Sequence, residues 1–333
     1  MKIENSNMGE NNARVCTISF NEKKLLTPFY FPSITSAETR SEITETIDFI
    51  IKRNYPGILV SCYDLLQLEQ KEIHIDKQIN QYHLNGGIVL LDSGEFENFH
   101  FRGDWKFENY EKILKQTKAD FFTSFDKTTE FGISQKEIDE FSEEYIIKSE
   151  KCSQDKNFIA ICHGIDEASM CNSIQKLLSE NEQIDIIAIP ERECGRTISD
   201  QCKIISKIRQ TINECKKNTI IHILGCGNPI SIAALVYAGA DTFDAVDWCR
   251  WSIDPKTWQY GNLAHTKLFD CDCDACDTKS IDERDRAWLH NLNFYYFYLV
   301  RLRRSIEKKK TLAEFLTSEN IDQKVISNLS KLF

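Results

Sequence analysis

Seven short apolar segments rich in β-branched residues alternate with longer amphipathic segments along most of this 333-residue chain. The seven are residues 57–62, 87–92, 120–126, 158–163, 184–190, 219–225 and 242–246. Segments of this length and composition suit strands that are buried on both faces of a parallel sheet. The amphipathic segments between them, such as residues 136–151 and 199–217, are long enough for right-handed helical crossovers. The alternation therefore predicts an α/β fold.

Polar residues and a glycine stand at or just past the carboxyl ends of six of these segments: Asp92, Asp126, His163, Glu191, Gly225 and Asp244. The alternation alone fits either a doubly wound open sheet or a closed barrel. In a closed barrel the carboxyl ends of the strands form one ring around one pocket, which favours the barrel for this chain. We expect a loose N-terminus over residues 1–13 and a TIM (β/α)8 barrel over residues 14–333.

The net charge of −10 excludes a protein that is covered in positive potential, so a polynucleotide partner would need a local basic patch. One candidate patch is the segment RLRRSIEKKK, with Arg301, Arg303 and Arg304 near its start. A solvated helix face explains the same run of charges. Charge alone therefore does not identify a partner.

The first residues lack the basic and apolar blocks of a signal peptide, and no apolar segment approaches the roughly 18 residues of a membrane span. Ten of the 13 cysteines are scattered singly, which fits reduced thiols rather than a disulfide framework. We therefore expect a cytoplasmic protein with no membrane partner.

The remaining three cysteines, Cys271, Cys273 and Cys276, form a CxCxxC cluster, and His290 follows at the start of a segment with helical spacing. Three thiolates and one imidazole make a closed tetrahedral set for Zn²⁺, whereas the alternative is three reduced cysteines in a loop. Four protein ligands leave no open position for water or substrate. We expect a structural zinc module, inserted in the C-terminal part of the barrel over about residues 268–310.

A set of short motifs runs in one order along roughly residues 14–316. The motifs are TPFYFP (27–32), LDSGEFE (91–97), SFDKTT (124–129), AICHG (160–164), AIPERECG (188–195), HILGCGNP (222–229), GADTFDAV (239–246) and LHNL (289–292). They resemble, in the same order, TPxFxP, LDSGGFQ, FDxxT, the VQG turn, AVGE, HLLGxGxP, GxDxFDxV and the end of the zinc module in the guanine transglycosylases. The chain thus resembles the family of tRNA-guanine transglycosylases and their DNA-modifying relatives.

The resemblance implies a TIM-barrel pentosyltransferase that exchanges guanine in a polynucleotide for a 7-deazaguanine base through a covalent aspartyl-glycosyl intermediate. A retaining exchange at C1′ needs one carboxylate as nucleophile and a second group that moves protons. Asp244 stands at the family's nucleophile position, and Asp92 stands at the position of its other catalytic aspartate, a general acid and base. Each aspartate could instead cap the end of a strand.

The resemblance also assigns a pocket for the base. The carboxylate of Asp126 can accept from N1–H and the exocyclic amine of guanine, while Phe96 and Leu224 are placed to sandwich the purine. His163 stands where the family commonly has a glutamine that contacts the carbonyl side of the base. The remaining residues expected to lie against the base or its 7-substituent are Gly164, Ile187, Ala188 and Gly225.

Several departures from the tRNA enzymes resemble the DNA-modifying branch, the 7-deazaguanine DNA transglycosylases. Glu95 and Glu97 replace a glycine and a glutamine and add negative charge beside the pocket, and residues 244–261 form a tryptophan-rich segment. We therefore expect DNA as the substrate. In that segment Trp248, Arg250 and Trp251 could stack against bases beside a flipped guanine, or the tryptophans could simply be buried packing residues.

Two alternatives remain open for the function. The first is a transglycosylase of the queuosine or archaeosine type that acts on tRNA. The second is a non-catalytic partner subunit, against which the presence of both Asp92 and Asp244 argues. The resemblance implies a free 7-deazaguanine such as 7-cyano-7-deazaguanine as the second substrate, and family habit allows a homodimer and other DNA-modification proteins as partners.

Overall fold

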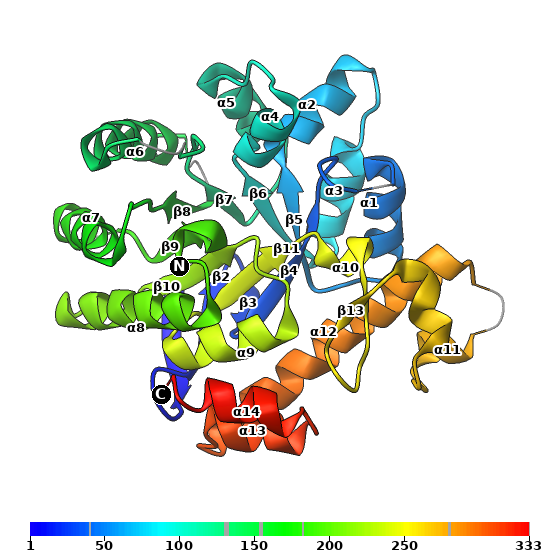
Figure 1. Cartoon of the computed structure of the whole chain (residues 1–333). Coiled ribbons are helices and arrows are strands. Elements are labelled where there is room, and N and C mark those ends of the chain that lie inside the picture. The colour runs from blue at the N-terminus through cyan, green and yellow to red at the C-terminus, as the bar shows by residue number, and fades with distance from the viewer. Residues whose placement is uncertain (40, 130–132, 153–155, 182, 279–280, 333) are drawn as a thin grey trace.

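The computed structural model describes residues 1–39, 41–129, 133–152, 156–181, 183–278 and 281–332 (Figure 1). Eight parallel strands close into one barrel in the order β10-β11-β4-β5-β6-β7-β8-β9. The strands are β4 (Phe29–Ile34), β5 (Gly57–Ser61), β6 (Ile88–Asp92), β7 (Phe121–Thr123), β8 (Asn157–Ile161), β9 (Ile186–Pro190), β10 (Ile220–Leu224) and β11 (Thr242–Ala245). The closed barrel confirms the predicted fold class and excludes the open sheet.

Six of these strands lie within the predicted apolar segments and β8 begins one residue before its segment, whereas β4 was not predicted as a strand. Its sequence, FYFPSI, is interrupted by Pro32, which has no N–H to donate to a neighbouring strand. Pro32 is nevertheless paired with Ala245 of β11 at the carboxyl end of the strand. All six residues of β4 are buried, so burial compensates for the missing donor.

Helices follow the strands and cover the outside of the barrel, with α6, α7 and α8 together on one side (Figure 1). They are α1 (Ile43–Lys52), α2 (Cys62–Gln70), α3 (Asp76–Leu84), α4 (Glu95–Phe101), α5 (Phe107–Gln116), α6 (Gln135–Glu150), α7 (Glu167–Glu180), η1 (Glu191–Glu193), α8 (Ile198–Glu214) and α9 (Pro229–Ala238). Capping boxes start α6 at Ser134 and α8 at Thr197, where Glu137 and Asp200 complete them. These caps fix the residues at which the loops after β7 and β9 end and the helices begin. In a barrel of this kind such loops carry the active site.

The N-terminal residues, expected to be loose, contain β1 (Lys2–Met8), which pairs antiparallel with β2 (Arg14–Phe20). A third strand, β3 (Lys23–Leu26), completes this small sheet. The expectation of a loose terminus was wrong because KIENSNM has few apolar residues and a bulge between Asn5 and Asn7, so no alternation marks it as a strand. Backbone pairing with β2 holds it in place.

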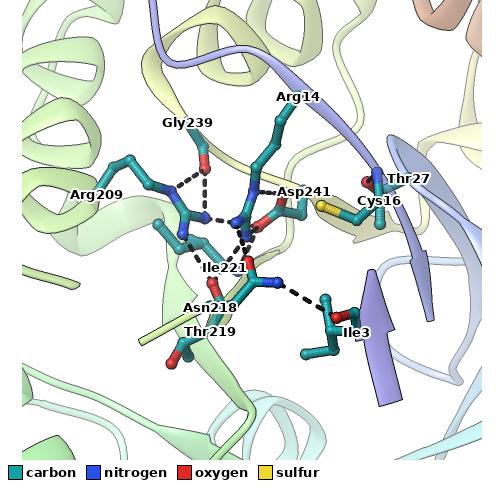
Figure 2. Close-up of polar contacts among 10 residues, drawn as sticks. All are labelled: Ile3, Arg14, Cys16, Thr27, Arg209, Asn218, Thr219, Ile221, Gly239 and Asp241. Carbon is teal, nitrogen blue, oxygen red and sulfur yellow. Dashed lines mark hydrogen bonds and ion pairs between the residues drawn. The ribbon is translucent and has the colours of Figure 1, made fainter. Parts of the chain in front are cut away.

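A buried ion-pair cluster ties β2 to the amino-terminal end of the barrel (Figure 2). Asp241, which precedes β11, accepts from Arg14 Nε at 2.7 Å and from Arg209 Nη2 of α8 at 2.6 Å. Both guanidinium groups also donate to the carbonyl oxygen of Thr219 at 2.8 Å. Burial alone would raise the pKa of Asp241, but Arg14 and Arg209 outweigh it and lower the pKa. The cluster thus joins the N-terminal sheet, α8 and β11 through satisfied charges.

The chain after β11 leaves the barrel and returns along its side. Its elements are α10 (Asp247–Arg250), β12 (Ser252–Ile253), β13 (Tyr260–Gly261), η2 (Leu263–Leu268), α11 (Asp274–Asp277), α12 (Glu283–Glu307), α13 (Leu312–Ser318) and α14 (Gln323–Leu329). Helix α12 runs from beside α11 to α13 (Figure 1). Its Tyr295 ring stacks on Tyr30 of β4 with centroids 4.0 Å apart, and the Tyr295 hydroxyl donates to the carbonyl oxygen of Gly227 at 2.7 Å. These contacts fix the helix against the barrel wall.

The part of the chain that the structure describes contains no helix that is both long and apolar enough to cross a membrane. The longest helix, α12, carries several arginines along its 25 residues.

Candidate active site

A cavity of about 320 Å³ opens at the carboxyl ends of the barrel strands. Three of the aspartates that line it are the candidates from the sequence: Asp92 at the end of β6, Asp126 in the loop after β7, and Asp244 in β11. Asp247, at the start of α10, lines it as well. A larger hollow of about 460 Å³ lies between α6 and α7, but none of these three aspartates lines it. The acidic cavity is therefore the candidate active site, in the place where barrel enzymes carry their chemistry.

The carboxylate of Asp244 is held by three hydrogen-bond donors. Oδ2 accepts from Ser33 Oγ at 2.7 Å, and Oδ1 accepts from His222 Nε2 at 3.1 Å and from Gly225 N–H at 3.2 Å. Since a carboxylate only accepts, His222 Nε2 carries a proton, and in the neutral ring Nδ1 accepts from Thr242 Oγ1 at 2.9 Å. Three donors fix the direction of the carboxylate, as a nucleophile requires.

Sequence reasoning did not assign a role to Ser33 or His222. For His222 the sequence contained a signal. It stands two residues before Leu224 on β10, and because alternate residues of a strand face the same side, the two side chains are expected on the same face. The same spacing relates Thr242 to Asp244 on β11, and the two strands pair His222 with Thr242. Ser33 gave no comparable signal, since β4 itself was not recognised as a strand.

Asp92 is half-buried in the cavity wall, and its Oδ2 accepts from the N–H of Gly94 at 3.0 Å. Desolvation raises its pKa to about 7, and the negative charges of Asp244 and Asp126 act in the same direction. The hydrogen bond from Gly94 opposes this rise without cancelling it. A carboxyl with a pKa near 7 can both give and take a proton at neutral pH, which suits a general acid and base.

Glu97, on α4, also lines the cavity and is almost fully buried. Its carboxyl group receives hydrogen bonds from the hydroxyl groups of Thr35 and, at 2.8 Å, Ser61. Burial, followed by the charges of Asp64 and Asp92, raises its pKa to about 8. Burial and these charges thus favour the neutral form of Glu97, so the expected negative charge of this residue beside the pocket stays a prediction.

Glu95 connects helix α4 to the loop after β7, and both segments contribute residues to the lining of the cavity. Its Oε1 accepts from the backbone N–H of Thr128 and its Oε2 from Asn98 Nδ2, both at 2.8 Å. Thr128 belongs to the loop that carries Asp126, and Glu95 starts the helix that carries Phe96. The two expected base contacts are thus tied to each other, and both line the cavity together with Leu224 and Gly225.

His163 lies behind Asp126 and does not line the cavity. Its Nε2 is 2.7 Å from Asp126 Oδ1, and its Nδ1 is 2.8 Å from Glu193 Oε1. Burial by itself lowers the pKa of His163, but the carboxylates of Asp126 and Glu193 raise it to about 10. The expected contact between His163 and the base is therefore replaced by a different role, in which an imidazolium fixes the orientation of Asp126.

Three other expected contacts also lie outside the lining of the cavity: Gly164, Ile187 and Ala188. Strand β9 extends to Pro190, so Ile187 and Ala188 are interior residues of the strand, fully buried and paired with β10. The residues of this segment that line the cavity are Pro190, Glu191 and Arg192. Ile187 and Ala188 thus lie inside the segment 184–190 and not at its carboxyl end, so their expected contact with the base stays a prediction without support from the lining of the cavity.

Of the three aromatic and cationic candidates after Asp244, only Arg250 lines the cavity, whereas Trp251 lines a neighbouring hollow and Trp248 is inside the protein. Trp248 is completely buried, and its Nε1 donates to the carbonyl oxygen of Ser33 at 2.9 Å, so it cannot stack on a base. Arg250 lines the cavity, forms an ion pair with Glu38 and lies over the ring of Trp251 at 5.2 Å. Burial thus confirms the packing alternative for Trp248.

The arginines of α12 point to contacts within the protein. Arg301 Nε is 2.9 Å from the carboxylate of Glu319, and Arg303 donates to the carbonyl oxygen of Pro28 at 2.7 Å. Pro28 directly precedes β4, so Arg303 lies at the opposite end of the barrel from Asp244. Arg304 is exposed. The role of these three arginines in nucleic-acid contact stays a prediction, without support from their positions.

The cysteine cluster and His290 meet at one point beside the barrel. The Sγ atoms of Cys271, Cys273 and Cys276 lie 3.6, 3.5 and 3.4 Å from His290 Nδ1. Tetrahedral zinc with ordinary Zn–S and Zn–N bonds places sulfur and nitrogen roughly 3.6 Å apart. His290 Nε2 donates to the carbonyl oxygen of Ile253 at 2.8 Å, which orients the ring and leaves Nδ1 free as a ligand. The four side chains can therefore hold a metal ion.

A closed parallel barrel with an acidic cavity at its carboxyl ends and a Cys₃His cluster at its side defines the class of α/β barrels with an appendage that can hold a metal ion. The chain belongs to the queuine tRNA-ribosyltransferase family, a family of pentosyltransferases whose model matches residues 9–320. This match agrees with the family resemblance of the motifs.

Curated relatives include three archaeal proteins named tRNA-guanine(15) transglycosylase. Those of Methanococcus aeolicus and Methanococcus vannielii are 23% and 26% identical, and each alignment covers 88% of this chain and 48% of the relative. The protein of Sulfolobus acidocaldarius is 22% identical, with 95% of this chain and 65% of the relative covered. The chain thus spans about half to two thirds of the length of these relatives.

Proposed function

We propose that this protein exchanges guanine in a polynucleotide for a 7-deazaguanine base through a covalent intermediate on Asp244. The observation that carries the proposal is the carboxylate of Asp244, oriented by Ser33, His222 and Gly225 toward a cavity that also contains Asp92 and Asp126. Membership of a pentosyltransferase family supports it independently.

In the first half of the reaction, a carboxylate oxygen of Asp244 attacks C1′ of the target nucleotide, and the bond from C1′ to N9 of guanine breaks. The departing base takes up one proton, which the protonated carboxyl of Asp92 supplies. The products are free guanine, a glycosyl ester on Asp244 and the carboxylate of Asp92. Ser33 and His222 hold the attacking group in one direction, which lowers the entropic part of the barrier.

In the second half, the 7-deazaguanine occupies the place that guanine left. Its N9–H gives a proton to Asp92, N9 attacks C1′, and the ester bond to Asp244 breaks. Two displacements at C1′ retain the configuration of the sugar. The pKa of about 7 lets Asp92 return to its starting state, so it serves as acid and base in turn.

Recognition of the base rests on Asp126 and on apolar surfaces. Asp126 Oδ1 accepts from His163 and from the N–H of Lys127, and its Oδ2 accepts from none of the residues that the structure describes. That oxygen suits the donor edge of guanine, N1–H and the exocyclic amine. Phe96 and Leu224 line the same cavity and supply the apolar faces.

The names of the archaeal relatives favour tRNA as the polynucleotide. The sequence predicts DNA as the polynucleotide, with a base such as 7-cyano-7-deazaguanine as the second substrate. The tryptophan-rich segment and the replacements at Glu95 and Glu97 support this alternative. The burial of Trp248 removes one of its three proposed contacts. We therefore rank tRNA first and DNA second.

We infer that the ion held by Cys271, Cys273, Cys276 and His290 is Zn²⁺, because three thiolates and one imidazole are its usual structural ligands. All four tetrahedral positions are filled by protein atoms, so the ion supplies no chemistry at the cavity. It would join α11 to α12.

The test is a base-exchange assay with a radiolabelled 7-deazaguanine and, in parallel, unmodified tRNA or guanine-containing duplex DNA. We expect label in tRNA, retained after denaturation, and none with Asp244→Asn. Label only in DNA would reverse the ranking of substrates. No label in either polynucleotide would contradict the proposed function.

A further inference from the structure

A second hollow, of about 810 Å³, adjoins the catalytic cavity. The two share Glu38, Glu95, Phe96 and Asp126 in their linings, so the hollow continues the cavity past the expected base site. Its volume falls in the range of small-molecule binding sites and is sufficient for one nucleotide. Phe96 and Asp126 also belong to the proposed base site, whereas the other residues that line the hollow make no contact with the base in the proposed exchange.

The short helix α4 presents phenylalanine side chains to water along this hollow. Phe96 and Phe99 both line it, and they are 40% and 55% exposed. Residues three apart lie on the same face of a helix, so the two rings follow one another away from the cavity. Phe101, also exposed, has a partner in the stacked ring of Tyr63, whereas Phe99 makes no ring contact within the described part of the chain. Phe99 is therefore an unpartnered aromatic surface.

Two cationic side chains line the same hollow as these rings, together with the acidic Glu38, Glu95 and Asp126. Arg102, at the end of α4, and Lys127, next to Asp126, both line the hollow and are exposed. Neither forms an ion pair with another residue that the structure describes. The ring centroid of His100, which also lines the hollow, lies 6.4 Å from that of Phe96 and 4.9 Å from that of Phe101. An aromatic face with cations at its edge is the combination that binds unpaired nucleotides.

We propose that this hollow binds an unpaired nucleobase adjacent to the target guanine in the same polynucleotide strand. The base stacks on Phe99, and Arg102 and Lys127 contact the neighbouring phosphate. The inference rests on the proposed function, because a target base taken out of its stack in the catalytic cavity brings its neighbours to the rim that the two spaces share. It adds a binding site beyond the one for the exchanged base.

The test measures the affinity of single-stranded oligonucleotides with one guanine, by fluorescence anisotropy at fixed salt and without turnover. RNA and DNA versions of one sequence distinguish the two polynucleotides. The variants are Phe99→Ala, Phe99→Trp and, as a control, Phe297→Ala, which removes an equally exposed phenylalanine on α12. Binding of free guanine is measured in parallel.

We expect Phe99→Ala to weaken oligonucleotide binding by about tenfold, since stacking of one base is worth roughly 5- to 150-fold in affinity. Phe99→Trp should bind as well as the wild type, and free guanine should bind all variants equally. Charge removal in Arg102→Gln or Lys127→Gln should each reduce the slope of log affinity against log salt by about 0.7. Unchanged affinity in Phe99→Ala, or an equal loss in Phe297→Ala, would overturn the proposal.

This experiment separates the inference from the proposed function. If the wild type binds the oligonucleotide through Phe99 but exchanges no base, the binding site stands and the proposed reaction fails. If exchange occurs in the wild type and Phe99→Ala leaves both affinity and KM for the polynucleotide unchanged, the reaction stands and the inference fails.

Discussion

Nε2 of His222 donates a hydrogen bond to Oδ1 of Asp244 at 3.1 Å. Both residues are buried, and their strands are neighbours in the barrel. The imidazole therefore orients the carboxylate of Asp244 through Oδ1, while Ser33 holds Oδ2. In the proposed reaction the carboxylate of Asp244 is therefore oriented before the attack, so it loses little conformational entropy in the transition state.

Replacing His222 should impair the chemical step more than substrate binding. We expect His222→Ala to lower kcat by roughly tenfold to a hundredfold, with little change in KM, because a small misplacement of a reacting group can cost about a hundredfold. His222→Gln keeps an N–H donor and should recover part of the rate. Steady-state kinetics check this, with thermal melting to verify folding. Equal kcat in His222→Ala and the wild type would show that the hydrogen bond does not orient the nucleophile.

The two half-reactions should depend on pH in opposite directions. Desolvation raises the pKa of Asp92 to about 7, so its protonated form is lost as the pH rises through 7. The rate of adduct formation should therefore fall by about tenfold per pH unit above this value. Release of the adduct by an incoming base needs the carboxylate and should rise with pH up to about 7. Single-turnover rates of each half check the two slopes; parallel slopes, or slopes that persist in Asp92→Asn, would argue against Asp92 as the shared acid and base.

The buried carboxyl of Glu97 should make the protein less stable in alkaline solution. Burial and the nearby charges of Asp64 and Asp92 raise its pKa from 4.5 to about 8. Between these values the folded state binds more protons than the unfolded state, so the free energy of unfolding falls as the pH rises, by at most about 1.4 kcal/mol per pH unit for one proton.

Glu97→Gln should remove this slope and be more stable than the wild type at pH 8. Urea unfolding at pH 5, 6.5 and 8 measures it. The exposed Glu143 offers a matched control, because Glu143→Gln should leave the slope unchanged. A wild-type slope equal to that of Glu97→Gln would mean that Glu97 is ionised in the folded protein.

Loss of one cysteine ligand should release the bound metal and loosen the attachment of α12. We expect Cys273→Ser to lose about one equivalent of zinc per chain and to lower the melting temperature by several degrees, because metal binding contributes to folding. Elemental analysis and calorimetry check both values. Cys215→Ser changes a partly exposed cysteine outside the cluster and should do neither. Unchanged metal content in Cys273→Ser would exclude the four-ligand site.

Most of the barrel could be predicted from the sequence because parallel strands buried on both faces leave continuous apolar segments. The exception was β4, in which Pro32 breaks the pattern although tertiary packing buries every residue of the strand. The polar β1 was missed because its sequence shows no apolar alternation, although backbone pairing with β2 orders it.

The site was predictable where a residue faces the cavity from the end of a strand, as Asp92 and Asp126 do. Residues that act through another side chain could not be placed in this way. The ring of His163 turns toward Asp126 and Glu193, because two carboxylates within hydrogen-bond distance outweigh the cost of burying its charge. Local sequence does not show which carboxylates a fold will bring to a histidine.

The most direct test of the proposed mechanism is to trap the covalent intermediate and locate it. Wild-type protein incubated with the polynucleotide substrate and no incoming base should form an adduct that survives denaturation, and mass spectrometry of its peptides should place the sugar on Asp244. Asp244→Asn should form none, while Asp92→Asn should form it slowly. An adduct in Asp244→Asn, or a modified residue other than Asp244 in the wild type, would contradict the account.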